Sequence, residues 1–342
     1  MAASSSPRVT VSLVTYNGSR WLPGCLASLA SQDLDDFEIL VQDNASRDGT
    51  QALLREWARR EPRMQVQESA RNEGYAAGHN AAIRDARGEV IILLNQDVEL
   101  DRGFLSAIVG AFEAHPDAGS VQPRLRQLAA PGERLATLDT TGLAMGRDRR
   151  AVSRAQGLLD GPEHQRSEVI WGADGPVPAY RRSALRDAAL SRPDGSWEVL
   201  DEDFFLYKED VDLAWRLRLL GWAACYEPAA LGWHGRGSGG TGATMMLDIA
   251  RTNRGVSSRV RRLSWRNQRL MQIKNEHPLD YLRDLPWIWR REVLSLLFIL
   301  ANDPRDLSAV PDLVRLAPVA WRKRRLLRAR LRDLGRAGVR PR

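Results

Sequence analysis

Strand-like and helix-like segments alternate from residue 8 to residue 115, and this alternation constrains the fold more than any other feature. Short apolar, β-branched runs predict strands at 8–16, 37–44, 64–68 and 89–97. Helical periodicity predicts helices over 21–32, 50–60, 76–85 and 102–115. Strands that alternate with helices pair in parallel, because each helix carries the chain back across a face of the sheet. We therefore predict an α/β fold, with a mostly parallel sheet covered by helices on both faces.

Polar residues follow three of these strands at the point where each strand ends. They are Thr15, Tyr16 and Asn17, then Asp43 and Asn44, then Asn95, Gln96 and Asp97. Ligands of parallel sheets bind outside the carboxyl ends of the strands, so we expect these side chains to share one site. Asn and Asp are also common turn residues, which would explain a single such strand end. Three together predict a binding site, in which Asp97 could hold a divalent cation that neutralises a diphosphate.

An acidic helix start near residue 209 supplies a second candidate site. Leucines recur at helical spacing from Leu213 to Leu220, and Asp212 stands four residues before Arg216, where an ion pair can form. Glu209 and Asp210 are then left to project from the helix start, and such a carboxylate can take a proton from an attacking hydroxyl. The alternative interpretation is that these acids only complement the helix dipole.

Two further segments combine polar side chains with glycines. Asn72 and Gly74 precede a predicted helix, where Gly74 would let the backbone approach a ligand closely. His234 follows an apolar strand and precedes a glycine-rich segment, 235–242, that could close over a ligand. His234 is then a candidate metal or phosphate ligand, although a lone histidine is often structural. A P-loop is excluded, because its GxxxxGK[ST] pattern is absent.

Composition indicates an ordinary globular protein of 342 residues, with 43% hydrophobic and 27% charged residues. The two cysteines, Cys25 and Cys225, form neither a disulfide framework nor a metal-ligand pattern. The N-terminus does not resemble a signal peptide, and the apolar run 293–301 is too short to span a bilayer. We expect a cytoplasmic location, with peripheral attachment to the inner face of the cell membrane.

The C-terminal part is expected to form a helical extension with a basic tail. We place a domain boundary near Gly255, which divides the chain into a catalytic domain, 1–255, and a helical subdomain, 256–342. Within the first part, residues 127–169 are expected to form an irregular insertion that covers the site.

The net charge of +7 arises from this tail, because residues 318–342 hold ten Lys or Arg and one Asp, a local charge of +9. The basic helix and the pair Trp287 and Trp289 suggest contact with an anionic membrane surface. Nucleic-acid binding is a rival and the less favoured one, and a solvated or oligomer-packing helix is a third explanation.

The ordered set of segments resembles the family 2 glycosyltransferases of the GT-A fold, particularly the bacterial rhamnosyltransferase-like branch. The resemblance spans about residues 8–237 and is carried by VSLVTYNG, VQDNASRDGT, NEGYAAGHN, LLNQD, DEDFFLYKEDVDLAWR and WHGRG. It implies a nucleotide-sugar site formed by Thr15, Tyr16, Asn17, Asp43, Asn44, Asn72, Gly74, Asn95, Gln96 and Asp97. It also implies that Asp210, beside Glu209, is the catalytic base, and that Asp97 and His234 bind a divalent cation, Mg²⁺ or Mn²⁺.

Two departures from the family pattern affect these expectations. The DXD-type motif is Asn95-Gln96-Asp97, so its first acid is missing and metal dependence is less certain. Lys208 stands directly before the acid pair, where a cation could lower the pKa of Asp210 or could instead extend away from the site.

The resemblance implies an inverting transfer of a sugar from a dTDP- or UDP-sugar, with a lean toward dTDP-rhamnose. The acceptor would be a saccharide or a lipid-linked molecule in cell-surface polysaccharide synthesis. The alternatives are a catalytically silent nucleotide-sugar binding or scaffold protein, motivated by the altered DXD motif, and a sugar nucleotidyltransferase.

Overall fold

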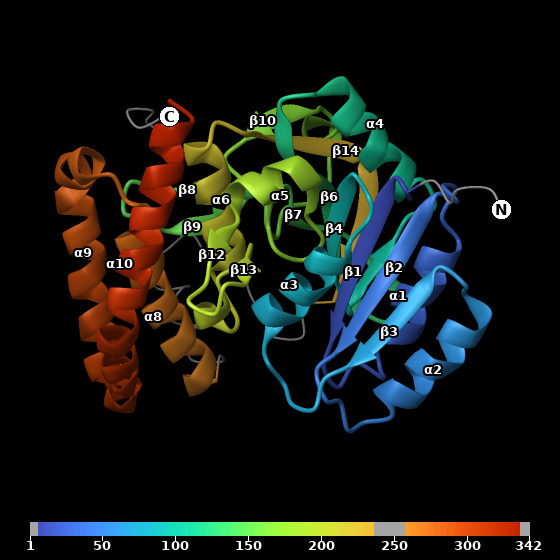
Figure 1. The fold of residues 1–342 in the computed structure, drawn as a ribbon, viewed down its shortest axis with the longest axis horizontal. Helices are drawn as coiled ribbons and strands as arrows, with labels where there is room; N and C mark the ends of the chain where they lie inside the picture. Colours follow the sequence, from blue (N-terminus) through green and yellow to red (C-terminus); the bar gives the residue numbers. More distant parts are fainter. Residues whose placement is uncertain (1–5, 236–256, 336–342) are drawn as a thin grey trace.

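A central ten-stranded sheet organises the computed structural model, which describes residues 6–235 and 257–335 (Figure 1). Its main path runs β10-β14-β6-β11-β4-β1-β2-β3, while β5 pairs with β14 and β7 pairs with β6. The strands β1, β2, β3 and β4 are parallel and span Val9–Thr15, Phe37–Asp43, Met64–Glu68 and Val90–Asn95. Each lies within about two residues of its predicted bounds.

The other half of the sheet mixes parallel and antiparallel pairs. The long strands β6 and β14 are parallel, whereas β11 runs antiparallel to both β4 and β6. These strands are β5 (Val98–Leu100), β6 (Ala118–Ala130), β7 (Glu133–Thr140), β10 (Glu168–Ile170), β11 (Ala179–Arg181) and β14 (Ala223–His234). Two small separate sheets add β8 (Leu143–Met145) with β9 (Ala151–Ser153), and β12 (Leu190–Ser191) with β13 (Trp197–Glu198).

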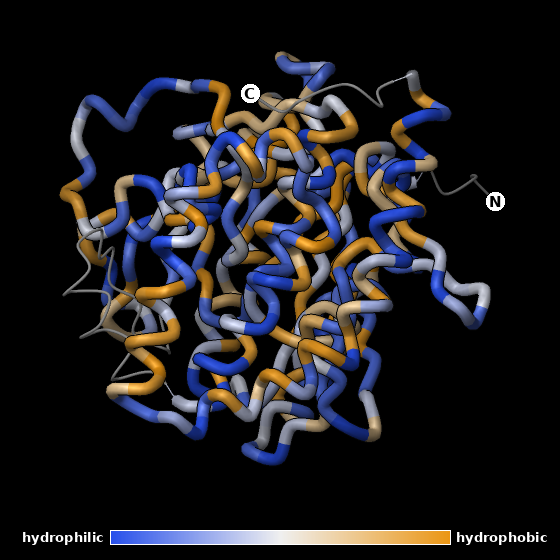
Figure 2. The backbone as a smooth tube through the Cα atoms, turned by 90° about the vertical axis from the view of Figure 1, so that its left-hand side faces the viewer, coloured by the Kyte–Doolittle hydropathy of each residue, from blue (hydrophilic) through white to orange (hydrophobic). Residues whose placement is uncertain are grey.

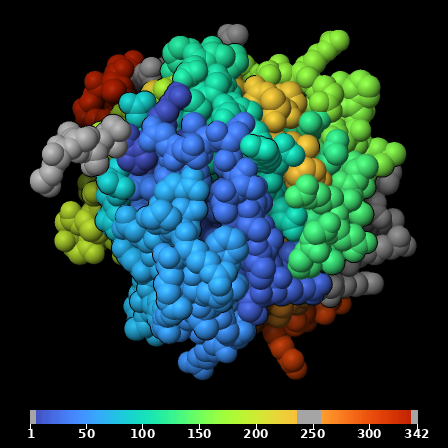
Figure 3. All heavy atoms as spheres, turned by 90° about the vertical axis from the view of Figure 1, so that its right-hand side faces the viewer, coloured from blue at the N-terminus to red at the C-terminus, as the bar shows by residue number. Residues whose placement is uncertain are grey.

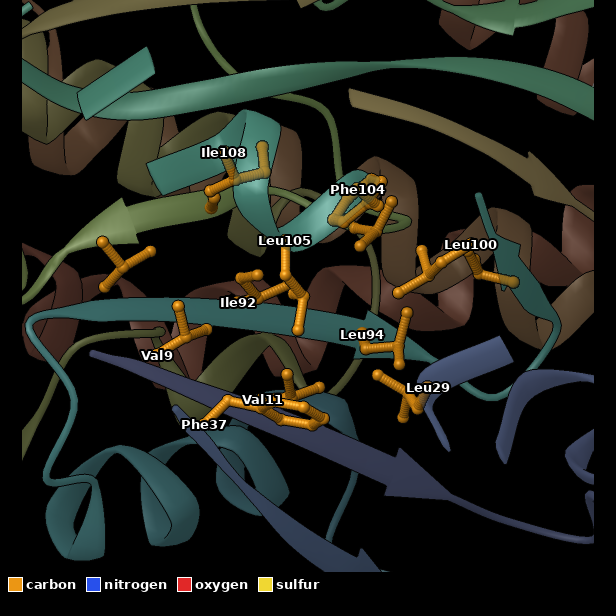
Figure 4. Close-up of a cluster of buried hydrophobic side chains, with 14 of the residues drawn as sticks. Val9, Val11, Leu29, Phe37, Ile92, Leu94, Leu100, Phe104, Leu105 and Ile108 are labelled. Atoms are coloured by element: carbon orange, nitrogen blue, oxygen red, sulfur yellow. The ribbon is translucent and has the colours of Figure 1, made fainter. Parts of the chain in front are cut away.

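Helices cover both faces of the sheet, as predicted. Alternate residues of a strand point to opposite faces, so Ile92 and Leu94 of β4 join one buried cluster while Ile91 and Leu93 join the other. The first cluster includes α1 (Leu22–Ala30), α2 (Thr50–Arg60) and α4 (Phe104–Ala114) (Figure 4). The second includes α3 (Tyr75–Asp85), α5 (Arg182–Ala188) and α6 (Glu209–Leu219). The N-terminal half forms most of the face shown in Figure 3.

The prediction of an irregular insertion over 127–169 was wrong for much of that segment. A hairpin of β6 and β7, a second hairpin of β8 and β9, and strand β10 occupy it. The strand pattern is weak in the sequence because the strands are short and bulged, and because Arg126 and Arg134 interrupt the apolar residues. Both arginines bind carboxylates, Asp160 and Glu99 respectively.

Three helices follow the half that contains the sheet and pack beside it (Figure 1), on the side that faces the viewer in Figure 2. They are α8 (Ser258–Asn275), α9 (Pro278–Asn302) and α10 (Ala309–Asp333). Short 3₁₀ turns lie at Pro162–His164, Glu202–Phe204 and Pro304–Ser308. Across residues 6–235 and 257–335, no helix is long and apolar enough to cross a membrane.

A buried ion network joins α6 to these C-terminal helices. The predicted pair forms, with Arg216 Nε 3.0 Å from Asp212 Oδ2, and both side chains are fully buried. Lys274 of α8 also contacts Asp212, at 2.8 Å, and Asp201. Lys323 of α10 binds Asp201 as well. Buried charges of both signs therefore compensate one another inside the interface.

Removal of Arg216 is expected to destabilise the protein strongly. In Arg216→Met, the backbone carbonyls of Ala188 and Val199 lose their donor and Asp212 loses one partner. We expect a loss of about 3–5 kcal/mol in the free energy of unfolding, measured by urea denaturation. The exposed helical pair of Arg60 and Glu56 is the matched control, and Arg60→Met should cost about 0.3–0.5 kcal/mol. Equal losses of unfolding free energy in the two variants would contradict the stabilising role of the buried Arg216 network.

Candidate functional site

A single cavity of about 590 Å³ collects the predicted strand ends and the acidic helix start. It opens at the carboxyl ends of β1 and β4, where the parallel topology predicts a site. Its lining includes eleven of the predicted residues: Thr15, Tyr16, Asn44, Asn72, Gly74, Asn95, Gln96, Asp97, Glu209, Asp210 and His234. Segments far apart in the sequence therefore meet around one space.

Neither Asn17 nor Asp43 is among the residues that line this cavity. Asp43 is fully buried and accepts hydrogen bonds from Thr15 Oγ1 at 3.1 Å and from the Ser46 amide at 3.0 Å. Asn17 has a positive φ of 49°, and its backbone N–H donates to Ser46 Oγ at 2.9 Å. Both residues fix the loop after β2, which brings Asn44 to the cavity.

An Asp–His–Asp chain marks one end of the cavity. His234 ends β14, where it pairs with Val98 of β5, so it lies beside the Asp97 turn. Its Nε2 atom is 3.4 Å from Asp97 Oδ1, and its Nδ1 atom is 2.9 Å from Asp139 Oδ2. Burial opposes the imidazolium, but Asp97 and Asp139 outweigh it and raise the pKa of His234 to about 10. Asp139 was not predicted from the sequence, although this acid stands near the end of strand β7.

The donor set at this end fits a divalent cation held mainly by its substrate. No cluster of three or more His, Cys, Asp or Glu ligands occurs in the described parts of the chain. Asp97 and His234 Nε2 could supply two ligands, which suits a cation whose other ligands are diphosphate oxygens and water. Asp139 binds the Nδ1 atom of His234 and so fixes the orientation of the ring. In this orientation, Nε2 could face a metal once it has lost its proton.

The carboxyl pair Glu209 and Asp210 also lines the cavity, from the first turn of α6. Asp210 accepts hydrogen bonds from the amides of Val211, at 2.8 Å, and Gly175, at 3.1 Å. Burial raises the pKa of Asp210 to about 6, and the nearby Asp174 adds to the rise. Burial and the Asp210 charge raise the pKa of Glu209 to about 8. The two carboxyls therefore lose their protons near neutral pH and influence each other.

Lys208 lines the cavity beside this pair, so it does not extend away from the site. As the sequence predicts, it lowers the pKa of Asp210, but burial and Asp174 have the larger effect. Asp174 and Gly175 also line the cavity and were missed in the sequence, where they resemble ordinary turn residues.

A strained turn delivers Glu209 and Asp210 to the cavity. Phe205, Tyr207 and Lys208 have φ values of 64°, 71° and 76°, in the left-handed region that side chains disfavour. Residues in such conformations cost about 1–3 kcal/mol each and persist only where their surroundings hold them. Nothing in the sequence signals this turn, because none of the three residues is a glycine.

Gly74 packs directly against this turn. Its φ is 92°, and a Cβ atom there would lie 2.6 Å from the carbonyl oxygen of Phe205, so only glycine fits. The next residue, Tyr75, donates its backbone N–H to the same carbonyl at 2.9 Å. The structure therefore requires a close approach of Gly74 to the chain itself, and the predicted approach to a ligand stays a prediction. The glycine-rich segment expected to close over a ligand lies, after Gly235, outside the described residues.

Comparison with known proteins identifies the family. Residues 10–187, just over half of the chain, match the model of glycosyl transferase family 2, so the chain belongs to that family and is a glycosyltransferase. N-acetylglucosaminyl-diphospho-decaprenol L-rhamnosyltransferase of Mycobacterium tuberculosis is 28% identical over 242 residues, which cover 64% of this chain and 72% of the relative. The predicted family and class of enzyme are therefore confirmed.

Two further similarities agree with this assignment. Poly-beta-1,6-N-acetyl-D-glucosamine synthase of Staphylococcus epidermidis is 25% identical over 223 residues, covering 65% of this chain and 48% of the synthase. The solved structure of the mannosyltransferase PcManGT from Pyrobaculum calidifontis, in complex with GDP-Man and Mn²⁺, matches with a TM-score of 0.51 at 18% identity. That match covers 96% of this chain and 87% of the mannosyltransferase, and it supports the GT-A fold.

Proposed function

We propose that the protein transfers a sugar from a nucleoside diphosphate donor to an acceptor hydroxyl, with inversion at the anomeric carbon. The observation that carries this proposal is the single cavity lined by Asp97, His234 and Asp210. One end suits a diphosphate with its cation, and the other end offers a carboxylate base. The sugar would lie between them.

Asp210 is the proposed base. A raised pKa near the working pH makes a carboxylate a better proton acceptor than an ordinary aspartate. Two backbone amides hold its side chain in place. In the direct displacement, Asp210 removes the proton of the acceptor hydroxyl, whose oxygen attacks the anomeric carbon as the bond to the diphosphate breaks. Glu209 lies beside it and would contact the bound sugar or acceptor.

The proposed nucleotide-sugar site is the strand-end part of the lining. Tyr16 and Asn44 would contact the nucleotide and Gln96 the sugar diphosphate, while Asn17 and Asp43 would act by holding the loop between them. Asp97 and His234 would hold a divalent cation, which neutralises the leaving diphosphate when bound. The mannosyltransferase that shares the fold was solved with Mn²⁺, which supports this proposal.

For the substrates, we favour a dTDP- or UDP-sugar, with dTDP-rhamnose first, and a saccharide or lipid-linked acceptor. The printed activity of the mycobacterial relative supports this choice. The cavity wall beyond Asp210 is partly apolar, with Leu143, Ala151 and Leu206. The reaction would then belong to cell-surface polysaccharide synthesis.

Asp210→Asn should lower kcat by about 10³-fold, because the amide cannot accept the proton. Nucleotide binding, measured by calorimetry with UDP and dTDP, should stay within about threefold, because the strand-end contacts remain. Near-wild-type turnover in this variant would exclude Asp210 as the base. Release of pyrophosphate rather than nucleoside diphosphate would identify a nucleotidyltransferase instead.

The pH profile gives an independent test. Because the base must be deprotonated, kcat/KM should rise with pH through about 6, the pKa of Asp210, rather than near the usual 3.8. Asp174 raises this pKa, so Asp174→Asn should move the acid limb to lower pH. An acid limb that does not respond to Asp174 would contradict the assignment.

Metal removal should abolish transfer, and Mn²⁺ should restore it. Asp139→Asn leaves both proposed ligands in place but loosens the His234 ring, so Mn²⁺ affinity should fall about 10–100-fold. Calorimetric titration with Mn²⁺ in the presence of UDP measures this without relying on activity. Asp101→Asn is the matched control, since the Asp101 carboxylate accepts a hydrogen bond from the Gly103 amide at 3.5 Å and is not among the residues that line the cavity. Full activity in excess chelator would overturn the proposed cation.

We also propose that the C-terminal helices lie on an anionic membrane surface, but through α9 rather than the basic tail. In α10, Leu327 and Leu331 are buried and Lys323 pairs with Asp201, so this face of the helix packs against the protein. Five exposed apolar residues lie along one face of α9, at spacings of seven, four, three and four residues: Leu282, Trp289, Val293, Leu296 and Leu300. Exposed Arg290 adds positive charge beside them.

Vesicle co-sedimentation tests this proposal. The protein should bind vesicles that contain anionic lipid more strongly than neutral vesicles, because both burial of the stripe and positive charge contribute. Leu296→Glu should weaken binding about tenfold or more, the loss expected when a buried leucine is replaced. Leu159→Glu, at a residue 73% exposed and outside the stripe, is the matched control. Equal binding of both variants would show that α9 does not touch the membrane.

A further inference from the structure

Asn267 of α8 binds the strained turn that carries the acid pair. This side chain is fully buried, and its amide nitrogen contacts three carbonyl oxygens of the turn. The distances are 3.0 Å to Phe204, 3.0 Å to Leu206 and 2.8 Å to Tyr207. The amide has two hydrogens, so the three carbonyls share them. One side chain from the C-terminal helices thus provides hydrogen bonds to three backbone carbonyls of this irregular turn.

The orientation of this amide is itself fixed. Asn267 Oδ1 accepts a hydrogen bond from Arg266 Nε at 3.0 Å, which directs the NH₂ group toward the turn. Arg266 also donates to the carbonyl of Asp203 at 2.7 Å and to that of Phe204 at 3.2 Å. The two neighbouring side chains therefore hold the start of the turn from the same helix.

α8 also holds the turn on its far side. Asn275 donates to Asp212 Oδ1 at 2.8 Å, and Lys274 lies 2.8 Å from Asp212 Oδ2. Asp212 follows Asp210 by two residues, so the acid pair lies between two points that α8 fixes. In addition, Ser264, one helical turn before Asn267, lines the cavity directly. α8 is therefore both a wall of the site and a support for its acids.

We propose that Asn267 is a positioning residue for sugar transfer, which holds the turn 204–208 so that Asp210 reaches the acceptor hydroxyl. This inference rests on the proposed role of Asp210 as base. The turn has three residues at positive φ and would relax toward common backbone angles without external bonds. Relaxation would move the carboxylate out of line with the reacting atoms, while the strand ends that bind the nucleotide would stay in place.

The proposal distinguishes positioning from general stability. A residue that only stabilises the fold would reduce the amount of folded enzyme and leave the kinetics of the folded fraction unchanged. A positioning residue acts on kcat and leaves nucleotide affinity intact, because misplacement by about 1 Å costs about 100-fold in rate.

Kinetic comparison of Asn267→Leu and Asn267→Ser with the control variant Gln268→Glu, all in the full chain, tests this role. Leucine matches the shape of asparagine but donates no hydrogen bond, and serine leaves space without overpacking. Gln268 is the neighbouring amide and donates to the Arg149 carbonyl at 2.8 Å, away from the turn. We expect kcat to fall about 100-fold in both Asn267 variants, with calorimetric UDP affinity within about threefold of wild type. Gln268→Glu should keep wild-type kinetics.

Amide hydrogen exchange provides the second readout. Exchange should accelerate at residues 204–212 in Asn267→Ser and stay unchanged in β1 and β4, where the nucleotide contacts lie. If Asn267→Leu does not fold, Asn267→Ser alone decides the question. Wild-type kcat in folded Asn267→Ser, or a loss of UDP affinity equal to the loss in kcat, would overturn the positioning role.

Failure of the proposed function would be visible separately. In that case the wild-type protein would show no transfer, or Asp210→Asn would keep it, whatever the Asn267 variants do. Transfer that depends on Asp210 but not on Asn267 would overturn only the inference drawn from α8.

Discussion

The buried carboxylate of Asp212 connects the parts of this molecule that must meet for the site to exist. It binds Arg216 within α6, and Lys274 and Asn275 from α8. An uncompensated buried charge would cost several kcal/mol, so these partners have to assemble together. Because Asp212 is also in the first turn of α6, the same contacts fix the helix end from which the acid pair projects.

The two ends of the cavity use acids in different surroundings. Asp97 faces the His234 ring, which is itself held by Asp139, so opposite charges gather where a diphosphate and its cation would lie. Asp210 is instead buried close to Asp174, and both burial and that charge raise its pKa, while two backbone amides hold its side chain. One fold thereby separates an electrostatic role from a proton-transfer role by environment alone.

The C-terminal helices contribute on two sides. Their inner side supplies Asn267, Lys274 and Lys323, which bind the segments around α6. Their outer side exposes the apolar stripe of α9. If that stripe lies on a membrane, the site and the surface that holds a lipid-linked acceptor are joined by a single rigid support. The predicted boundary near Gly255 would then divide the sequence into two segments that act together in one function.

The parallel half of the sheet could be predicted from the sequence alone, because apolar periodicity and polar residues at strand ends are local patterns. The sequence also determined which strand ends converge, since parallel strands place their carboxyl ends at one edge. The hairpins of β6 to β9 were not predictable in this way, because short bulged strands interrupted by arginines lack a clear period. Asp139, Asp174 and Asn267 were missed for a related reason: each acts on a residue 36 to 95 positions away. How the turn at 205–208 is held follows only from the tertiary structure, since side chains of α8 and close packing against Gly74 and Tyr75 stabilise its strained backbone.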